Sequence, residues 1–536
     1  MYRVLVADAI KPEGLTPLLQ ASNIELVQKT VDECTEELHV MDAILVRSAT
    51  KVTEDLMEKM PNLKIIARAG VGVDNIDVPA ATKRGIVVVN APDGNTISTA
   101  EHTFAMMAAL MRHIPQAYAS LKIHKEWKRN AFSGTELNGK TLGIVGMGRI
   151  GSEIAKRAKA FGMSVLVFDP FLTSERAKKM NVTALPLDEL IEKADIITVH
   201  TPLTKETRGL LNKARLLKAK KGVYLINCAR GGIIDEDDLY ELIVEGHVAG
   251  AALDVFVEEP AVHNKLLELD QVIATPHLGA STKEAQLNVA SQVAQEVLLF
   301  LNGNPVSNSI NLPAISKELF EKIQPFYHLV KQLGSIASQC MKEGIHEISV
   351  TYAGSALDFD TSILTKSLLS GFFNSRIDIA VNEVNALLVA KERGITIGEK
   401  ISQNTFGYAN AISLTVKGDN RIFEIKGTYI ENYGPRVVSL NGFNIDFNPE
   451  GNLLYIQHTD RPGVIGRVGK ILGDHDVNIA TMQVGRKQAG GEAIMILSFD
   501  KPLCDEVYNI LNELDDTTFT YRISLSSHPS LPKIQE

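Results

Sequence analysis

The chain has little cysteine, a single tryptophan and no long apolar run. Its 4 cysteines lie far apart and form no C-x-x-C pair, which favours reduced thiols over a disulfide framework. No apolar run approaches the length of a membrane span, and the first residues, MYRVLVADAI, follow a strand pattern that does not resemble a signal peptide. We therefore expect a cytoplasmic protein.

Blocks of basic residues are also missing. The formal net charge of -9 argues against a general nucleic-acid binder. Hydrophobic residues make up 45% of the chain and charged residues 22%, so ample core can be buried. A chain of 536 residues is too long for one core, and roughly three or four domains are expected. We expect small molecules and further subunits as partners, with no nucleic acid, no membrane and no metal site.

The strongest pattern lies between residues 140 and 169. Thr141 to Val145 is a short apolar run typical of a buried parallel strand. Gly146, Gly148 and Gly151 follow as G-x-G-x-x-G, in which the first glycine allows a tight turn and the second lets the backbone approach a pyrophosphate. The third lets a helix pack on the strand. Apolar residues at helical spacing then predict that helix, with its amino end toward the phosphates.

Asp169 ends this unit, directly after a second apolar run, Ser164 to Phe168. Its carboxylate can accept hydrogen bonds from both ribose hydroxyls and would repel a 2′-phosphate, which favours NAD over NADP. Glycine-rich strand-to-helix turns also serve purely structural ends. The strand, the helix and the acid together predict a dinucleotide site.

Four further short apolar strands follow, at residues 194–200, 223–227, 249–253 and 272–274. The carboxyl ends of parallel strands share one sheet edge, where ligands of open α/β sheets bind. Polar or small residues follow each strand and predict one rim there, made of Thr201, Pro202, Cys228, Ala229, Arg230, Asp254, His277 and Gly279.

Arg230, Glu259 and His277 suit the oxidation of a hydroxy acid, which needs a base for the hydroxyl proton and a cation for the carboxylate. Arg230 can hold a carboxylate bidentately. His277 can take the proton because imidazole titrates near neutral pH, and Glu259 can orient the ring. Taken singly, each has a plainer explanation: a salt-bridge partner, a surface histidine and a turn carboxylate. Their joint position at strand ends favours catalysis.

Earlier strand patterns at residues 2–8, 43–47 and 63–68 predict another parallel sheet. Arg47 and Ser48 follow one of these strands, and Arg68 and Gly70 follow another. Two arginines at equivalent strand ends indicate an anionic substrate, and salt bridges to neighbouring carboxylates are the alternative.

Residues 47–97 and 139–282 resemble the D-2-hydroxyacid dehydrogenase family, through VRSAT, ARAGVGVDNID, GIVGMGRIG, NCARGG, ALDVFVEEP and PHLGAST. The resemblance implies that Arg230, Glu259 and His277 are catalytic, with His277 as the base. It also implies that Arg47 and Arg68 bind the substrate phosphate or carboxylate. The NAD contacts that it implies are Arg149, Ile150, Asp169, Thr201, Cys228, Ala229, Asp254, Gly279 and Ala280.

Within that family, ELNGKTLGIVGMGRIG and PHLGASTKEAQ are similar to a long branch that opens L-serine biosynthesis. The resemblance implies NAD-dependent oxidation of 3-phospho-D-glycerate to 3-phosphohydroxypyruvate. Two alternatives stay open. A glyoxylate or hydroxypyruvate reductase would share the arginine, glutamate and histidine, and a dinucleotide-sensing corepressor or scaffold would use the same fold without needing catalysis.

Residues 318–450 predict an α+β unit that resembles the intervening domain of the long branch. Residues 452–526 predict the order strand, helix, strand, strand, helix, strand, which is ferredoxin-like. That unit resembles an ACT domain, a regulatory module that binds amino acids between paired subunits. The match implies an effector site, with L-serine as the leading candidate, at His458, Thr459, Asp460 and Asn478. A tight turn in which Asp460 merely caps the helix is the alternative.

The predicted fold class is α/β. A Rossmann-type domain at 98–282 is inserted in a flavodoxin-like substrate domain, 1–97 and 283–312, and the intervening and ACT domains follow. Apolar surface on Rossmann helices and ACT strands predicts a homo-oligomer, and the resemblance implies a tetramer. EWKR, at 126–129, fits a subunit contact, a reach into a neighbouring active site or a plain surface loop.

Overall fold

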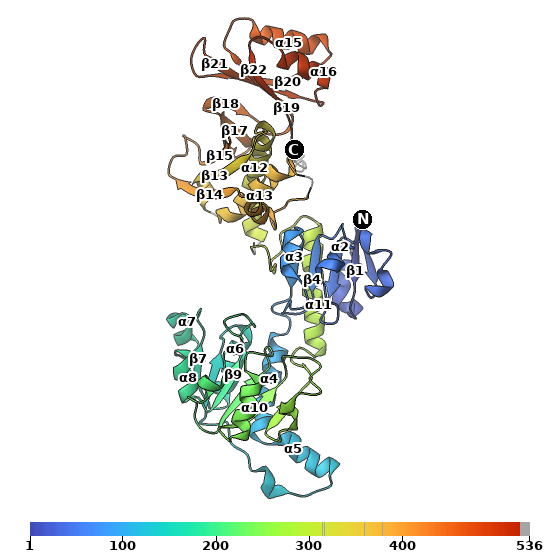
Figure 1. Cartoon of the computed structure of the whole chain (residues 1–536), viewed down its shortest axis with the longest axis vertical. Helices are drawn as coiled ribbons and strands as arrows, with labels where there is room; N and C mark the ends of the chain where they lie inside the picture. Colours follow the sequence, from blue (N-terminus) through green and yellow to red (C-terminus); the bar gives the residue numbers. More distant parts are fainter. Residues whose placement is uncertain (314, 316, 359, 378, 526–536) are drawn as a thin grey trace.

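The computed structural model describes residues 1–525 except 314, 316, 359 and 378. Figure 1 shows an elongated molecule whose four sheets follow one another along the long axis. Residue 526, the predicted end of the ACT domain, lies outside the described residues. Within the described ranges, no helix combines the length and the apolar character that a membrane crossing requires.

The first sheet has five parallel strands in the order β2-β1-β3-β4-β5. Hydrophobic clusters lie on both of its faces, which explains the fully buried runs AILV and VVVN. The order is flavodoxin-like and confirms the predicted fold. The sequence prediction missed β2 and β5. The elements are β1 (Tyr2–Val6), α1 (Thr16–Leu19), β2 (Ile24–Gln28), β3 (Ala43–Val46), α2 (Glu54–Glu58), β4 (Ile65–Arg68), α3 (Val78–Lys83) and β5 (Val87–Asn90).

The second sheet has seven parallel strands in the order β12-β11-β10-β9-β6-β7-β8. The order reverses between β6 and β9, as in Rossmann sheets, and ligands bind beyond the strand ends at such a reversal. The sequence prediction contained each strand except the short β8. The elements are β6 (Thr141–Val145), α6 (Arg149–Ala160), β7 (Ser164–Phe168), α7 (Ser174–Lys179), β8 (Thr183–Ala184), α8 (Leu187–Lys193), β9 (Ile196–Val199), α9 (Lys213–Leu216), β10 (Val223–Asn227), α10 (Glu236–Val244), β11 (Val248–Leu253) and β12 (Val272–Ala274).

Helices α4 (Thr96–Met111) and α11 (Lys283–Leu301) lie at the junction of these two units (Figure 1). Met107 of α4 is buried in a core of the second sheet, whereas Val293 of α11 is buried in a core of the first. The chain therefore leaves the first unit through α4 and returns to it through α11, so the second unit is an insertion. A short helix, α5 (Ile114–Tyr118), projects at the lower end of the molecule.

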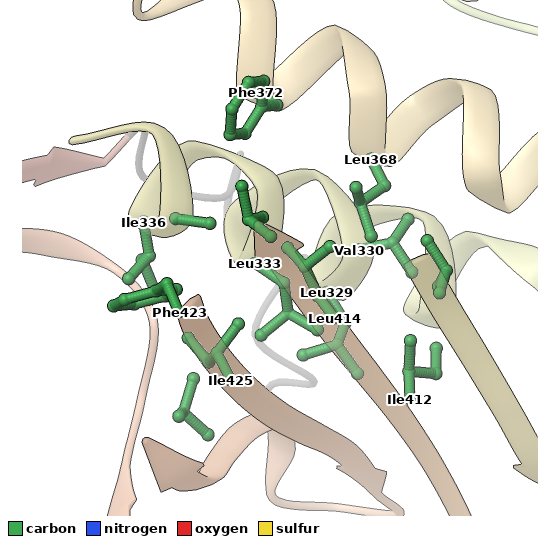
Figure 2. Close-up of a cluster of buried hydrophobic side chains, with 14 of the residues drawn as sticks. Leu329, Val330, Leu333, Ile336, Leu368, Phe372, Ile412, Leu414, Phe423 and Ile425 are labelled. Atoms are coloured by element: carbon green, nitrogen blue, oxygen red, sulfur yellow. The ribbon is translucent and has the colours of Figure 1, made fainter. Parts of the chain in front are cut away.

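The third sheet is mixed, in the order β14-β13-β15-β16-β17-β18. Figure 2 shows how Leu333 of α12 and Phe372 of α13 lie above its strand residues, including Leu414. Residues 434–447 form a hairpin, because Asn441 and Gly442 take the positive φ values of 49° and 79° that a two-residue Asn-Gly turn requires. The elements are α12 (Lys317–Cys340), β13 (Ile345–Gly354), α13 (Thr361–Asn374), α14 (Ala386–Glu392), β14 (Thr396–Ser402), β15 (Asn410–Gly418), β16 (Ile422–Ile430), β17 (Gly434–Leu440) and β18 (Phe443–Phe447).

The fourth sheet has the antiparallel order β20-β21-β19-β22 and confirms the ferredoxin-like prediction. Its two faces are buried differently. Leu454 and Leu497 pack under α15 and α16, whereas Tyr455 and Ile494 belong to the core of the third sheet. The last two units therefore share one hydrophobic core. The elements are β19 (Gly451–Thr459), α15 (Val464–Asp474), β20 (Ile479–Arg486), β21 (Glu492–Phe499), α16 (Asp505–Asn512) and β22 (Thr517–Leu525).

Candidate active site

A cleft of about 520 Å³ lies between the first two sheets. One wall comes from the loops after β4 and β5, and the other from the loops after β6, β9, β10, β11 and β12. All of these are carboxyl ends of parallel strands, where ligands of such sheets bind. The whole predicted rim lines this cleft, namely Thr201, Pro202, Cys228, Ala229, Arg230, Asp254, His277 and Gly279. Four of the other expected NAD-binding residues line it as well, namely Gly148, Arg149, Ile150 and Ala280.

The three glycines of the loop after β6 meet different surroundings. A Cβ on Gly146, whose φ is 100°, would lie 2.4 Å from the carbonyl oxygen of His200. A Cβ on Gly151 would lie 2.1 Å from the carbonyl oxygen of Gly146, so this glycine sets the distance between helix and strand. A Cβ on Gly148 would enter open space. Only Gly148 is therefore available for the approach of a ligand.

The polar groups of the cleft wall are also suited to binding a dinucleotide. Asp169 accepts hydrogen bonds from the backbone N–H of Met147 at 2.7 Å and of Phe171 at 2.8 Å, which fixes its carboxylate against the glycine loop. The Oγ1 atom of Thr201 and the Nδ1 atom of His200 are buried and lack a hydrogen-bond partner in the described part of the chain. Buried polar atoms are normally paired, and both residues line the cleft. A polar ligand in the cleft would supply the missing partners.

His277 and Glu259 form a pair at the cleft. The Nδ1 atom of His277 lies 2.9 Å from Oε2 of Glu259, and the N–H of Phe256 donates to the other oxygen at 3.2 Å. Because an ionised carboxylate only accepts, Nδ1 carries the proton and Nε2 is left with a free lone pair. The imidazole is half exposed, so it can meet a ligand. This arrangement is able to act as a general base.

Arg230 reaches across the cleft. Its Nε atom donates to Asp74 at 3.1 Å and its Nη1 atom to the carbonyl of Ala229 at 2.6 Å. A Cβ on Gly72 would lie 1.9 Å from Nη2, so the guanidinium touches the loop after β4. Gly231, directly after Arg230, leaves no room for a substrate, because a Cβ there would meet the backbone of Phe256 at 2.0 Å.

Arg68 is a largely buried cation without a carboxylate partner among the contacts of the described residues. Its Nη1 atom donates to the carbonyl of Ala69 at 3.0 Å, and its buried Nε atom has no partner there. Burial, followed by the charges of Arg230 and Arg47, lowers the pKa of Arg68. A bound anion would relieve this repulsion. Ser48 is exposed nearby in sequence, and Gly70 leaves the space that the Arg68 guanidinium fills.

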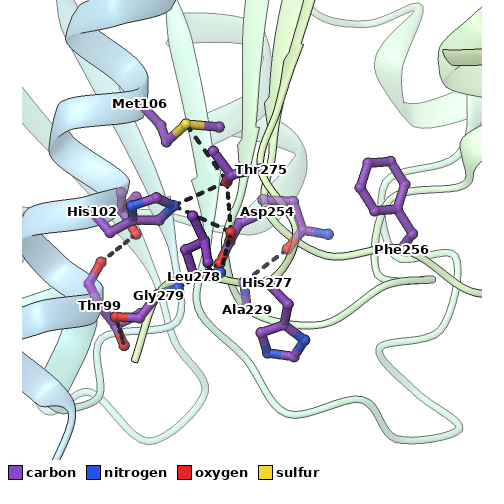
Figure 3. A network of polar contacts seen from close by, with 12 residues as sticks. Thr99, His102, Met106, Ala229, Asp254, Phe256, Thr275, His277, Leu278 and Gly279 are labelled. Carbon is purple, nitrogen blue, oxygen red and sulfur yellow. Dashed lines mark hydrogen bonds and ion pairs between the residues drawn. The ribbon is translucent and has the colours of Figure 1, made fainter. Parts of the chain in front are cut away.

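Asp254 is the centre of a polar network that the sequence analysis did not resolve (Figure 3). Its Oδ1 atom accepts from the hydroxyl of Thr275 at 2.6 Å and from the N–H of Leu278 at 2.7 Å. The Nε2 atom of His102 lies 3.2 Å from the same oxygen. Its Oδ2 atom accepts from the N–H of Gly279 at 2.8 Å. Burial alone would raise the pKa of Asp254, but these hydrogen bonds outweigh it and lower the pKa.

The predicted effector residues are not brought together within one chain. Asp460 follows β19, whose Thr459 pairs with Glu492, and Asn478 precedes β20, whose Ile479 pairs with Phe499. Those partners stand at opposite ends of β21, roughly 23 Å apart at the rise of an extended strand. Within a single subunit, Asn478 therefore lies far from Asp460, and the expected site between paired subunits stays a prediction. Asp460 instead accepts from Arg486 at 2.9 Å, which lowers its pKa.

Three family models match the chain. The model for the D-isomer specific 2-hydroxyacid dehydrogenase NAD binding domain matches residues 104–279. The model for the D-3-phosphoglycerate dehydrogenase intervening domain matches residues 322–441, and the ACT domain model matches residues 453–516. These regions correspond to the second, third and fourth sheets.

Relatives match over almost the whole length. The chain is 62% identical over 525 residues to the D-3-phosphoglycerate dehydrogenase of Bacillus subtilis, covering 98% of this chain and 100% of the relative. The enzyme of that name from Methanocaldococcus jannaschii is 44% identical over 516 residues, covering 96% of this chain and 98% of the relative.

Solved structures match the first two units. The D-lactate dehydrogenase from Aquifex aeolicus, complexed with NAD and lactic acid, is 33% identical with a TM-score of 0.52, covering 58% of this chain and 100% of that one. A glyoxylate reductase from Paecilomyes thermophila is 29% identical with a TM-score of 0.52, covering 58% of this chain and 98% of that one.

Proposed function

This chain belongs to the D-3-phosphoglycerate dehydrogenase family, and from that premise we propose how its residues perform the reaction. It is an NAD-dependent oxidoreductase that converts 3-phospho-D-glycerate to 3-phosphohydroxypyruvate, the first step of L-serine biosynthesis. The observation that carries the mechanism is the meeting of Arg230 with the pair of His277 and Glu259 at one cleft.

In our mechanism, Arg230 holds the substrate carboxylate and His277 removes the hydroxyl proton at C2. The Nε2 atom of His277 takes this proton, because Glu259 already fixes the proton on Nδ1. The Glu259 carboxylate then stabilises the imidazolium and keeps its orientation. Bound NAD supplies the acceptor for the hydride that leaves C2. Gly148 and Asp169 would hold it, together with the lining residues given above, on the turn and helix that Gly146 and Gly151 shape.

Arg47 and Arg68 bind the substrate phosphate in this proposal, with Ser48 and Gly70 beside them in the same loops. After burial, the charges of Arg230 and Arg47 are the largest causes that lower the pKa of Arg68, and Asp74 and Asp8 offset them only in part. This excess of positive charge at Arg68 supports an anion at this place, since a dianionic phosphate would offset it. The positive cluster distinguishes a phosphorylated substrate from glyoxylate, which carries a single carboxylate.

Substituting Arg47 by Gln tests the phosphate assignment. We expect the KM for 3-phospho-D-glycerate to rise by roughly 10-fold or more, in line with the loss of a charge-assisted hydrogen bond. The KM for an unphosphorylated 2-hydroxy acid should change far less. Arg84→Gln is the matched control, because Arg84 pairs with Glu58 on the surface of the same unit. Equal changes for both substrates would favour a reductase of unphosphorylated acids.

Steady-state rates with 3-phospho-D-glycerate and NAD test the function as a whole. His277→Ala should lower kcat roughly 100-fold or more if this residue is the base, on the usual magnitude of general-base catalysis. Near-normal turnover in that variant would remove His277 from the role. Absence of turnover in the unmodified protein would favour the corepressor alternative.

We further propose regulation by an amino acid, with L-serine as the first effector to test, at His458, Thr459, Asp460 and Asn478. The ACT family match supports a regulatory role. Because Asp460 and Asn478 stand at opposite ends of one sheet, a site containing both needs two paired subunits. Adding serine to the steady-state assay tests this, and unchanged rates would exclude serine as the effector.

The whole enzyme is proposed to be a cytoplasmic homotetramer with domains at 1–97 with 283–312, 98–282, 318–450 and 452–526. Free thiols at all four cysteines support a reducing compartment. Apolar side chains on α5 and the helical turn and loop that follow it support pairing of subunits, since Ile114, Leu121 and Trp127 are 54%, 53% and 82% exposed. EWKR lies in this segment, so we assign it to the subunit contact. Light scattering of the purified protein gives the subunit number.

A further inference from the structure

The loop that carries His277 is held in a conformation that a histidine rarely adopts. His277 has a φ of 55°, in the left-handed region that favours glycine. Such a backbone persists only when its surroundings determine it. The residue that determines it here is Asp254. Its carboxylate accepts from the N–H groups of Leu278 and Gly279, and its backbone carbonyl accepts from the N–H of His277 at 2.9 Å.

Asp254 can hold the loop only if its own carboxylate is fixed. The side chain is 1% exposed, so its oxygens depend on protein donors instead of water. Two donors come from side chains, the hydroxyl of Thr275 at 2.6 Å and Nε2 of His102 at 3.2 Å. Thr275 belongs to the strand end that leads into the loop, whereas His102 belongs to α4. His102 is therefore the anchor that lies outside the loop.

The hydrogen bonds determine which nitrogen of His102 carries a proton. The Thr275 hydroxyl has one proton, and the short contact with Asp254 shows that the carboxylate accepts it. The Nε2 atom of His102 lies 3.1 Å from the same hydroxyl oxygen, which can only accept from it. Nε2 is therefore an N–H donor shared between Asp254 and Thr275. Figure 3 shows the ring of His102 directed at both.

Helix α4 also connects this anchor to the other unit. It begins at Thr96, shortly after the last strand of the first sheet, and its Thr99 donates to the carbonyl of Gly279 at 3.2 Å. His102 lies one turn further along the same helix face. The helix that joins the two sheets thus contacts both the far end of the His277 loop and the carboxylate beneath it.

We propose that His102 is a positioning residue for the dehydrogenase reaction, in which its Nε2 donor fixes Asp254 and, through it, the backbone of residues 275–279 that presents His277. The inference deepens the proposed function and rests on His277 as the base. His102 does not touch the reacting atoms in this proposal. Its contribution is the placement of the imidazole of His277 relative to the C2 hydroxyl.

Two amide variants of the full chain test the proposal. His102→Gln places an amide N–H near the position of Nε2, whereas His102→Asn is one methylene shorter and places it near Nδ1, out of reach of Asp254. We expect His102→Asn to lower kcat by roughly 10- to 100-fold, the effect of a small misplacement of a catalytic group. The KM for 3-phospho-D-glycerate should stay within about threefold, because the arginines are untouched. His102→Gln should restore most of kcat.

A second measurement does not depend on turnover. Amide hydrogen exchange of the peptide that contains residues 275–279 should be faster in His102→Asn than in the unmodified chain, and His102→Gln should restore the protection. A kcat within twofold of normal together with unchanged exchange in His102→Asn would overturn the proposal. Equal defects in the Asn and Gln variants would overturn the role of the Nε2 donor.

The two hypotheses fail in different ways. If the unmodified protein does not oxidise 3-phospho-D-glycerate, the proposed function fails, and the variants are then compared with hydroxypyruvate and NADH, since a reductase would use the same histidine. If the unmodified protein is active and the Asn variant is equally active with unchanged exchange, only the inference on His102 fails.

Discussion

At the scale of single residues, the active site depends on which protons the buried groups hold. His277 and His102 are each fixed in one tautomer by a neighbouring acceptor, Glu259 for the first and Asp254 with Thr275 for the second. A third histidine, His200, is held neutral for a different reason. Burial lowers the pKa of His200 to about 3, and its Nε2 atom lies 2.8 Å from the hydroxyl of Thr198.

His200 predicts a loss of stability in mild acid. An unfolded histidine titrates near 6.5, so between about pH 6.5 and pH 3 the unfolded chain binds one proton more than the folded chain. Stability therefore falls as the pH falls below about 6.5, by up to about 1.4 kcal/mol per pH unit from this residue. In His200→Gln, the thermal unfolding midpoint should fall less between pH 7 and pH 5 than in the unmodified protein. Parallel pH profiles for the two proteins would contradict the prediction.

At the scale of elements, two glycines in the strand-turn-helix unit of β6 and α6 have different roles, one structural and one facing the ligand. Gly151 has a backbone oxygen where a Cβ would stand, whereas Gly148 has open space there and a φ of -71° that any residue adopts. Both glycines belong to the same motif and are only three positions apart. The motif alone does not reveal this difference, because it depends on what lies opposite each residue.

Alanine substitutions at the two positions should therefore give different defects, a loss of stability at Gly151 and a loss of NADH binding at Gly148. Gly151→Ala is expected to lower the stability of the second unit by about 1 to 3 kcal/mol, the usual effect of overpacking, because the carbonyl of Gly146 must move. Gly148→Ala should leave the unfolding midpoint unchanged and weaken NADH binding by roughly 10-fold, since its methyl group would stand where the pyrophosphate approaches. NADH fluorescence titration and thermal unfolding of both variants check this. A stable Gly151→Ala protein with normal NADH binding would contradict it.

At the scale of the whole molecule, the first two units and the last two units pack together in different ways. The first two units face each other across a cleft and are joined by α4 and α11. The last two pack directly on each other, because one face of the ACT sheet completes the core of the third sheet. Asn382 of the third unit donates to the carbonyl of Gly85 at 2.6 Å, so the third unit also contacts the substrate unit.

The shared core predicts that the third and fourth units unfold together. Ile494 and Leu497 lie on opposite faces of β21, the first in the shared core and the second under the ACT helices. Ile494→Ala and Leu497→Ala should each lower the same calorimetric transition, with a loss of about 2 to 5 kcal/mol typical of a buried aliphatic side chain. Two separate transitions, of which each variant lowers a different one, would contradict a common core.

The sequence by itself determined the local features of this protein. The apolar runs gave the strands of the Rossmann sheet, because a strand buried on both faces must be continuously apolar. The residues after those runs predicted the rim of the cleft, because the carboxyl ends of parallel strands lie at one edge of the sheet. Short or half-exposed strands such as β2 and β8 escaped prediction, since few of their residues are buried.

Only the tertiary structure decided which distant residues meet. The contact of His102 with Asp254 joins positions 152 residues apart, and no spacing along the chain encodes it. The same holds for Arg230 with Asp74, for the separation of Asp460 from Asn478, and for the shared core of the last two sheets. Burial and pairing depend on what packs against a side chain from elsewhere in the chain. Periodicity reports only which face is apolar, so it cannot name the partner that covers it.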